Sequence, residues 1–314
     1  MNTLTAGLLW ILIVPAAPAP KVQPGIPNEL IDVLPEDTAA VLVMDGKRFS
    51  KTAFGAAFWK GFAAAQGPDE QVRVADIARD VEFALIAQFL IEKHAGDFCF
   101  VLRLREGSEL PKTLMAEAEK DGRPAVPEKI GKRSVYSFGS PGGSFARLDD
   151  RTLMVVLASG NGKQTERTRA AAYADRERPG PNAVLRKMLA DEPADVPAVR
   201  LYGHHSTKLG HSAGLVMAIF GVEFEALSTL GEKVVSYRGG IRVGDAAEIE
   251  LRFTLRNADA AKEFLNAYDT VAKDDPVLKE WRKACKAVRD GDDVIVTGKA
   301  TPALIDRMST KPNK

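Results

Sequence analysis

The sequence predicts an α+β protein made of two tandem ferredoxin-like (βαββαβ) units with antiparallel sheets. In each half of the chain the expected order is strand, helix, strand, hairpin, strand, helix, strand, which is the order of the split βαβ unit. In the first half, the apolar side chains at every second position of 98–104 are followed by the turn 105–107 and a helix. The second half repeats this pattern, with apolar side chains at every second position of 249–255, followed by 256–258 and a helix. In the strand 247–255, Glu248, Glu250 and Arg252 alternate with apolar residues, as an antiparallel sheet with one solvated face requires. The two halves therefore read as an internal duplication.

The first unit is expected over residues 34–192, after a flexible, proline-rich lead-in over 17–33. A helix is predicted from 48 to 65 because Phe54, Phe58 and Phe62 recur at the spacing of one helical face. The apolar run 83–91 is compatible with a buried strand or with the end of a helix that begins near Val74. The remaining predicted strands are 39–45, 98–104, 133–138 and 144–158, and the remaining helices are 110–120, 163–178 and 182–190.

The second unit is expected over residues 193–307 and is followed by a disordered tail, 308–314. The prolines of 179–181 and 193–197 interrupt the helical pattern and mark the boundary. The predicted strands are 196–202, 234–243, 247–255 and 293–297. The predicted helices are 213–230, 259–271 and 277–288.

The N-terminus predicts export. Residues 7–14 are apolar and are followed by a run of Pro and Ala, which is typical of a secretory signal peptide. Cleavage is expected after Ala16, so that residues 1–16 form the signal peptide and the mature protein is periplasmic or extracellular. The alternative is an uncleaved N-terminal anchor, but the apolar stretch is shorter than the roughly 20 residues of a spanning helix.

The bulk composition argues against a nucleic-acid partner. Lys and Arg total 43 against 42 Asp and Glu, giving a formal net charge of +1, whereas nucleic-acid binding depends on a basic excess. The two cysteines, Cys99 and Cys285, could form a disulfide in an oxidising compartment. The other interpretation is that both are small buried apolar residues, because Cys285 falls on an apolar stripe at helical spacing.

Two short stretches carry a resemblance. Leu34-Pro35-Glu36-Asp37-Thr38 leads into an apolar strand and a Phe-rich helix, and the stretch 147–153 (RLDDRTL) leads into another strand. These features resemble uncharacterised exported bacterial proteins of the planctomycete type, a domain of unknown function that opens with Leu-Pro-x-Asp-Thr. The resemblance covers mainly the first half of the chain. It implies no known activity and therefore transfers no functional residues.

One histidine cluster could hold a metal ion. His204, His205 and His211 follow a predicted strand, where imidazoles could bind Zn²⁺. No Asp or Glu lies between Asp195 and Glu223 to complete such a site, and a solvated loop rich in His, Ser and Gly explains the histidines better. No metal ligand is therefore assigned.

No other motif supports a catalytic or cofactor site. The loop 159–164 lies between a strand and a helix, but it lacks the first Gly and the final Ser or Thr of a phosphate-binding loop. Ser140 and Ser144 flank glycines without forming a nucleophile elbow. The carboxylate pairs 149–150, 274–275 and 292–293 are explained by turns. Catalytic residues are thus unknown, and no cofactor is expected.

These observations favour a non-catalytic binding or cell-envelope-associated protein. Its interaction surface would be the polar sheet face with Glu248, Glu250 and Arg252, and with Tyr237 nearby. The partner would be a protein or an envelope component. Self-association through the apolar run 213–222 is a further hypothesis, against the simpler one that this run packs in the core. The alternative function is a metal-dependent enzyme that uses His204, His205 and His211.

Overall fold

The structure is a computed structural model. It contains two compact units. Residues 24–47 and 75–192 form the first unit, and residues 1–23, 48–74 and 193–314 form the second. This grouping assigns residues 48–74 to the second unit, whereas the sequence analysis placed them in the first. The described residues are 26–34, 38–53, 55–56, 59, 75–89, 98–120, 127–138, 143–157, 170–171, 174, 181, 183–190, 197–204, 233–244, 246–274 and 282–301.

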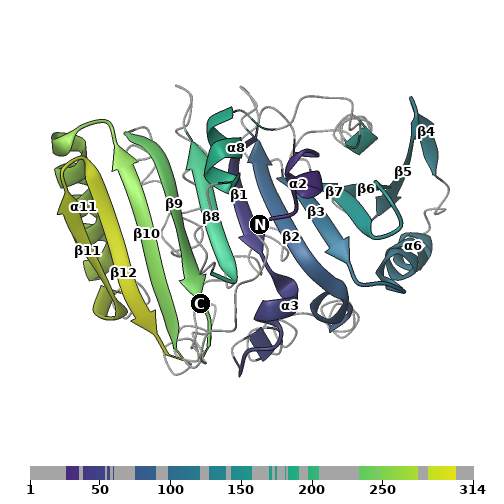
Figure 1. Ribbon diagram of the computed structural model, residues 1–314, viewed down its shortest axis with the longest axis horizontal. Helices are drawn as coiled ribbons and strands as arrows, with labels where there is room; N and C mark the ends of the chain where they lie inside the picture. The colour runs from purple at the N-terminus through teal and green to yellow at the C-terminus, as the bar shows by residue number, and fades with distance from the viewer. Residues whose placement is uncertain are drawn as a thin grey trace. The chain divides into compact units, whose positions relative to one another are not determined.

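The first unit contains an antiparallel sheet with the strand order β1-β2-β3-β7-β6-β5-β4 (Figure 1). Its strands are β1 (Thr38–Met44), β2 (Val81–Phe89), β3 (Phe98–Leu104), β4 (Glu128–Ile130), β5 (Arg133–Phe138), β6 (Gly143–Arg147) and β7 (Thr152–Leu157). The helices described with it are α2 (Asn28–Ile31), α6 (Leu110–Lys120) and α8 (Ala183–Ala190), and α3 (Gly46–Phe49) follows β1.

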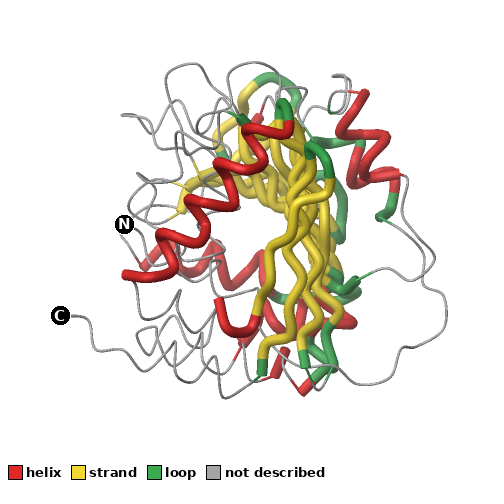
Figure 2. The backbone as a smooth tube through the Cα atoms, turned by 90° about the vertical axis from the view of Figure 1, so that its left-hand side faces the viewer, coloured by secondary structure: helices red, strands yellow, loops and turns green. Residues whose placement is uncertain are grey.

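The second unit contains an antiparallel sheet with the order β8-β9-β10-β12-β11. Its elements are β8 (Val199–His204), β9 (Val234–Arg242), β10 (Ala247–Leu255), α11 (Ala258–Asp274), β11 (Cys285–Asp290) and β12 (Asp293–Ala300). Figure 2 shows α11 as a long helix that crosses one face of the sheet obliquely.

Both units follow the same path. Three consecutive strands pair in sequence, a helix follows the third strand, and the last strand returns to pair with the third. The same backbone hydrogen bonds recur at this join. Leu104 N donates to Arg151 O at 2.7 Å, and Leu255 N donates to Asp292 O at 2.9 Å. The residues that follow these two leucines form a second matching pair of bonds. Arg105 N donates to Asp80 O at 2.8 Å, and Arg256 N donates to Lys233 O at 2.9 Å.

The chain is therefore of the α+β class with antiparallel sheets, but the strand order differs from the ferredoxin-like one. In the split βαβ unit the first strand lies beside the third and the second lies at an edge. Here the second strand lies between the first and the third, as β9 does between β8 and β10. The linear order of elements could not distinguish these two arrangements, because both alternate strands and helices in the same way.

Two predicted elements are wrong in their boundaries. The run 144–158 is two strands, β6 and β7, because residues 148–151 form a hairpin loop. The run 277–288 was expected to be helical, yet Cys285–Asp290 is the strand β11, paired with β12 across the two-residue loop 291–292. Gly291 opens this loop with φ 62°, a conformation that favours glycine. The ambiguous run 83–91 belongs to the strand β2 over its described part.

Burial explains why the central strands of the first unit are almost entirely apolar. All seven residues of β1 are buried, so its side chains are covered on both faces, and a continuous apolar run is typical of such a strand. Arg186 of α8 forms an ion pair with Asp32, immediately after α2, with 2.6 Å between Nη1 and Oδ1. These two segments therefore lie close together in the first unit.

In the second unit, aromatic side chains connect α11 to the sheet. Phe264 of α11 lies against Phe253 of β10 with the ring centroids 5.2 Å apart, and Phe253 lies against Tyr237 of β9 at 6.2 Å. Burying such side chains removes a large apolar area from water. Asn257 caps the helix, since its Oδ1 accepts a hydrogen bond from Ala260 N at 2.9 Å.

Both cysteines are free and buried, Cys99 in β3 and Cys285 in β11. Burial raises the pKa of the Cys285 thiol to about 12. None of the helices in the described ranges is long and apolar enough to cross a membrane. The predicted signal peptide and the apolar run 213–230 lie outside those ranges.

Tyr237 occupies the buried face of the sheet rather than the polar face on which the sequence analysis expected it. Its ring covers Gly203 of the neighbouring strand, and a Cβ at that position would overlap the ring. The side chain is buried, and its hydroxyl has no hydrogen-bond partner among the described residues. Burial raises the pKa of Tyr237 above its usual value of 10.0.

The Tyr237→Phe variant is expected to be more stable by about 1 kcal/mol at neutral pH, because it removes a buried hydroxyl that lacks a partner. The raised pKa means that the unfolded state loses this proton first, so the wild-type protein loses stability as the pH rises above about 10. The variant should lose less over the same range. Urea denaturation at pH 7 and above pH 10 measures both effects. A destabilised variant at pH 7 would contradict the assignment of an unsatisfied hydroxyl.

Candidate functional site

The predicted histidine cluster is described only at His204. This residue ends β8 and is partly buried, and burial lowers its pKa from the usual 6.5. His205 and His211 lie outside the described residues, as do the loop 159–164 and the run 213–222. Within the described ranges no group of three or more His, Cys, Asp or Glu is placed to hold a metal ion.

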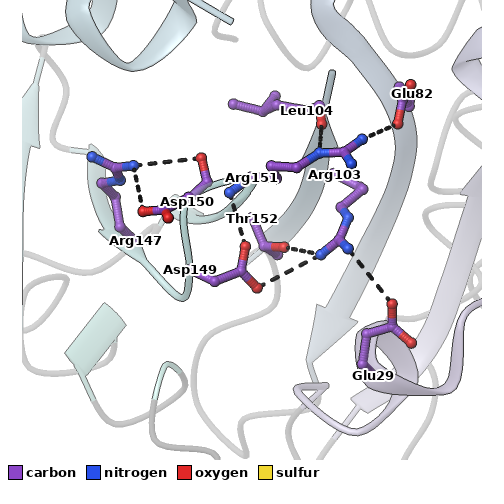
Figure 3. Close-up of polar contacts among 9 residues, drawn as sticks. All are labelled: Glu29, Glu82, Arg103, Leu104, Arg147, Asp149, Asp150, Arg151 and Thr152. Atoms are coloured by element: carbon purple, nitrogen blue, oxygen red, sulfur yellow. Dashed lines mark hydrogen bonds and ion pairs between the residues drawn. The ribbon is translucent and has the colours of Figure 1, made fainter. Parts of the chain in front are cut away.

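The turn predicted for the carboxylate pair 149–150 is confirmed, and it organises a group of charges. The loop 148–151 connects β6 to β7 (Figure 3). Asp149 Oδ1 accepts a hydrogen bond from Arg151 N at 2.9 Å, the local bond by which an Asp favours a turn. We call the residues drawn in this figure, except Leu104, the hairpin cluster: Glu29, Glu82, Arg103, Arg147, Asp149, Asp150, Arg151 and Thr152.

Arg151 joins the loop to the two strands beyond it. Its Nε donates to the carbonyl oxygen of Leu104 at 3.0 Å, and its Nη2 lies 2.6 Å from Glu82 Oε2. The pairing of β2 with β3 shifts between Val81 and Phe83, which makes Glu82 the extra residue of a β-bulge. Such a bulge redirects a side chain at the end of a strand, and here the carboxylate faces Arg151 (Figure 3).

Arg103 lies on β3 and connects the same loop to α2. Its Nη1 donates to Thr152 Oγ1 at 2.8 Å and lies 3.6 Å from Asp149 Oδ2. Its Nη2 lies 3.8 Å from Glu29 Oε1. The Arg103 side chain is only 27% exposed, so its charge is held mainly by these protein groups.

Asp80 fixes the start of β2 beside the end of β3. Its side chain is fully buried and accepts hydrogen bonds from Arg79 at 2.7 Å and from Ser108 at 2.8 Å, and Arg105 Nε lies 2.7 Å from the same carboxylate. Burial alone would raise the pKa of Asp80, but the hydrogen bonds from Arg79 and Ser108 and the charge of Arg105 outweigh it and hold the pKa below 3.8. The carboxylate is therefore ionised at neutral pH.

These charged groups serve the structure of the first unit. The guanidinium of each arginine considered above lies against a carboxylate, a hydroxyl or a backbone carbonyl. The matching positions of the second unit carry other charges, because Lys233 stands in the place of Asp80 and Asp292 in the place of Arg151. Only the backbone bonds are common to both units.

A second polar surface lies on the second unit, on the sheet face opposite α11. In β10 exposed and buried residues alternate, and the buried ones face α11. The register of β9 and β12 extends this surface to both sides. We call it the outer face, and in the view of Figure 1 α11 lies behind these strands. Its charged and polar members are Arg238, Arg242, Glu248, Glu250, Arg252, Thr297 and Lys299.

Some charges of the outer face are paired and some are not. Glu248 lies between Arg242 and Lys299, with its Oε1 3.9 Å from Lys299 Nζ. Arg252 lies directly opposite Arg238, although like charges in this position repel each other. Arg252 is compensated by Asp293, whose Oδ2 lies 2.6 Å from its Nη1.

Arg238 and Glu250 form no hydrogen bond or ion pair with any described residue, and both are exposed. Glu250 lies opposite Gly240 and Thr297, neither of which carries a charge. Among the charges that β9, β10 and β12 place on this face, Arg238 and Glu250 are thus the ones that a partner could engage without breaking a contact within the described residues. The alternation in β10 predicts Glu250 on this surface, whereas no pattern in the sequence singles out Arg238.

Comparison with known proteins finds a likeness of fold. No protein-family model and no curated protein sequence matches the chain. Crystal form III of TP0453 is similar to it with a TM-score of 0.55 and 11% identity, covering 90% of this chain and 98% of that chain. Crystal form IV of TP0453 gives a TM-score of 0.52, also with 11% identity, over 92% of this chain and 98% of the other. At this identity the similarity concerns the fold alone.

Asp80→Asn is expected to destabilise the protein by about 2 kcal/mol at pH 7. This is less than a fully buried ion pair, because the arginines reach solvent. Since the folded-state pKa is lowered, the contribution is present above about pH 4 and is lost as the pH falls further. The difference between wild type and variant in urea denaturation should therefore shrink from pH 7 to pH 3. An equal difference at both values would contradict the ionised assignment.

Arg151→Ala is expected to lower the stability by about 1 to 2 kcal/mol, because Glu82 and the Leu104 carbonyl both lose a charged donor. The matched control is Arg147→Ala in the same hairpin. Arg147 is half-exposed, and its only hydrogen-bond partner among the described residues is Asp150, at 3.4 to 3.5 Å. Its removal should therefore change the stability by less than about 0.5 kcal/mol. Equal losses in both variants would show that Arg151 has no special role.

Proposed function

We propose that the protein is exported and acts outside the cytoplasm as a non-catalytic binding protein associated with the cell envelope. Its binding surface is the outer face of the second unit. The observation that carries this proposal is the pair of exposed, unpaired charges, Arg238 and Glu250, on a surface where the neighbouring charges are compensated.

The physical argument rests on how charges contribute to binding. An exposed charge that already forms an internal ion pair gains little from a second ion pair with a binding partner. An unpaired charge can instead form a complementary contact that steers and orients the binding partner. Arg238 next to Arg252 favours an acidic group, and Glu250 favours a basic group beside it. The partner would therefore be a protein or envelope component that presents both signs of charge within a short distance.

Export is supported by the N-terminal sequence pattern. Cleavage after Ala16 would remove the apolar segment 7–14 and leave a mature chain that begins at Ala17. The mature protein would then be retained at the envelope by its binding surface rather than by a membrane-spanning helix.

The two units are best explained by duplication of one ancestral unit. The shared strand path and the two matched backbone hydrogen bonds support this proposal. Because the charges at the join differ between the units, the surface chemistry would have diverged after the duplication. Binding through the outer face would then be a property of the second unit.

The test is fractionation of a bacterial host with two membranes that expresses the full chain. The wild-type protein should start at Ala17, sediment with the envelope and be released by about 1 M salt, which screens surface charges. The double variant Arg238→Glu with Glu250→Arg keeps the net charge and should appear in the soluble exported fraction.

The matched control exchanges two exposed charges elsewhere, Glu106→Lys with Lys262→Glu, and should behave as wild type. Retention of the double variant at the envelope would overturn the binding surface. A wild-type protein that stays in the cytoplasm with residues 1–16 intact would overturn export.

The second candidate is a metal-dependent enzyme that uses His204, His205 and His211. It is favoured by the position of His204 at the end of β8, immediately before His205 in the sequence. Elemental analysis of the purified mature protein separates the candidates. Stoichiometric zinc that disappears in the His204→Ala, His211→Ala variant would overturn the non-catalytic proposal.

A further inference from the structure

The strand β11 is an edge of the second unit's sheet. It pairs with β12 and with no other described strand, and Figure 1 shows it at the end of the row of strands. An edge strand presents unpaired N–H and C=O groups that can pair with another strand. What covers such an edge depends on its side chains.

The outward side chains of β11 form a short row with one apolar residue between two opposite charges. Lys286, Val288 and Asp290 alternate along the strand, and their register with β12 places them on the outer-face side. Val288 is 53% exposed and is one of two large apolar side chains exposed in the described parts of the chain. Lys286 forms no ion pair with a described residue, and Asp290 reaches only Arg252, at 3.9 Å.

This row is self-complementary under a two-fold axis. When two copies of β11 run antiparallel and are centred on Val288, each Lys286 lies opposite Asp290 of the other copy, and the two Val288 side chains lie side by side. Residues directly opposite each other share a face and lie about 5 Å apart between Cβ atoms. The pairing therefore forms two ion pairs and buries both exposed valines.

Neighbouring registers lack this match. A shift by one residue places Lys286 opposite Arg289, which is a like-charge pair. A shift by two residues in the same direction places Lys286 opposite Val288 and leaves both charges without partners. The sequence of the strand thus selects a single register, in the way that cross-strand pairs select register within a sheet.

We propose that β11 is a homodimer interface at which two copies of this chain join by antiparallel pairing centred on Val288. The occupant of the edge is a second copy, because the charges of the strand complement the same strand read in reverse. A closed two-fold pair uses the β11 edge of each copy, so this contact does not continue into a fibre. The contact of two six-residue strands is small, below about 1,000 Å², so the dimer is a weak and reversible one.

The experiment is a charge exchange followed by sedimentation equilibrium over a range of concentrations. Wild type should form a dimer with rising concentration. Lys286→Asp places two carboxylates opposite each other at each end of the pairing, and Asp290→Lys places two lysines opposite each other. Each change acts twice in the two-fold pair, so either variant should weaken dimerisation by at least about tenfold.

The decisive step is to mix the two variants. Lys286→Asp offers two acidic positions and Asp290→Lys offers two basic ones, so the mixture should form a heterodimer with an affinity near that of wild type. The double variant, Lys286→Asp with Asp290→Lys, should dimerise with itself. Lys262→Asp, on the exposed side of α11, is the control and should leave dimerisation unchanged.

Three results would overturn the proposal. These are a wild-type protein that stays monomeric at all concentrations, variants that dimerise as well as wild type, and a mixture that does not associate. Val288→Lys should also abolish the dimer, because it places two charges at the centre. All these positions are exposed, so circular dichroism and the thermal midpoint should match wild type and confirm that the variants are folded.

Discussion

In each unit the sheet is completed when the last strand returns to pair with the third strand. The backbone hydrogen bonds Leu104 N to Arg151 O and Leu255 N to Asp292 O lie at this join. Without the last strand, β3 and β10 would each be an open edge with buried apolar side chains. In the second unit the helix that follows the third strand, α11, packs against β10, β11 and β12. Most other features of the two units depend on this pairing.

The charged residues fall into two groups: those that hold the ends of the paired strands, and those that the fold leaves unpaired. In the first unit Arg151 and Asp80 hold the ends of the paired strands, and each is bonded to several neighbouring groups. In the second unit the corresponding positions are Asp292 and Lys233, and the unpaired charges lie instead on the outer face. Charges that stabilise the fold are therefore poor candidates for binding, and the useful ones are those that the fold leaves unpaired.

The sequence predicted most elements of secondary structure but not how they are arranged. The helix 110–120 and the strands 98–104, 133–138 and 247–255 are confirmed at both ends, because alternation and helical spacing are local properties. A turn was predicted at 149–150, but the run 144–158 was still predicted as one strand, because the loop 148–151 contains no glycine and depends on side-chain bonds of Asp149. The strand order was wrong because pairing between distant segments leaves no local pattern.

The residues of the outer face could likewise be predicted from the sequence only in part. Alternation in β10 identified Glu248, Glu250 and Arg252, since each sits between buried residues. Tyr237 was placed on the wrong face because its position depends on the register of β9 with β8, where it covers Gly203. Arg238 was not singled out, since its lack of a partner follows from what the neighbouring strands place beside it.

The two-residue loop after β11 has a consequence for the order in which the second unit folds. The two-residue loop of Gly291 and Asp292 has the smallest entropic cost of loop closure among the described hairpins of this unit. The strands β11 and β12 can therefore pair early and locally. The hairpin then has to find β10 across the length of α11, a contact between residues far apart in sequence, and such contacts slow folding. Until that step, both edges of the hairpin are open, and the charges of β11 favour pairing of its edge only with a strand whose charges match them in register.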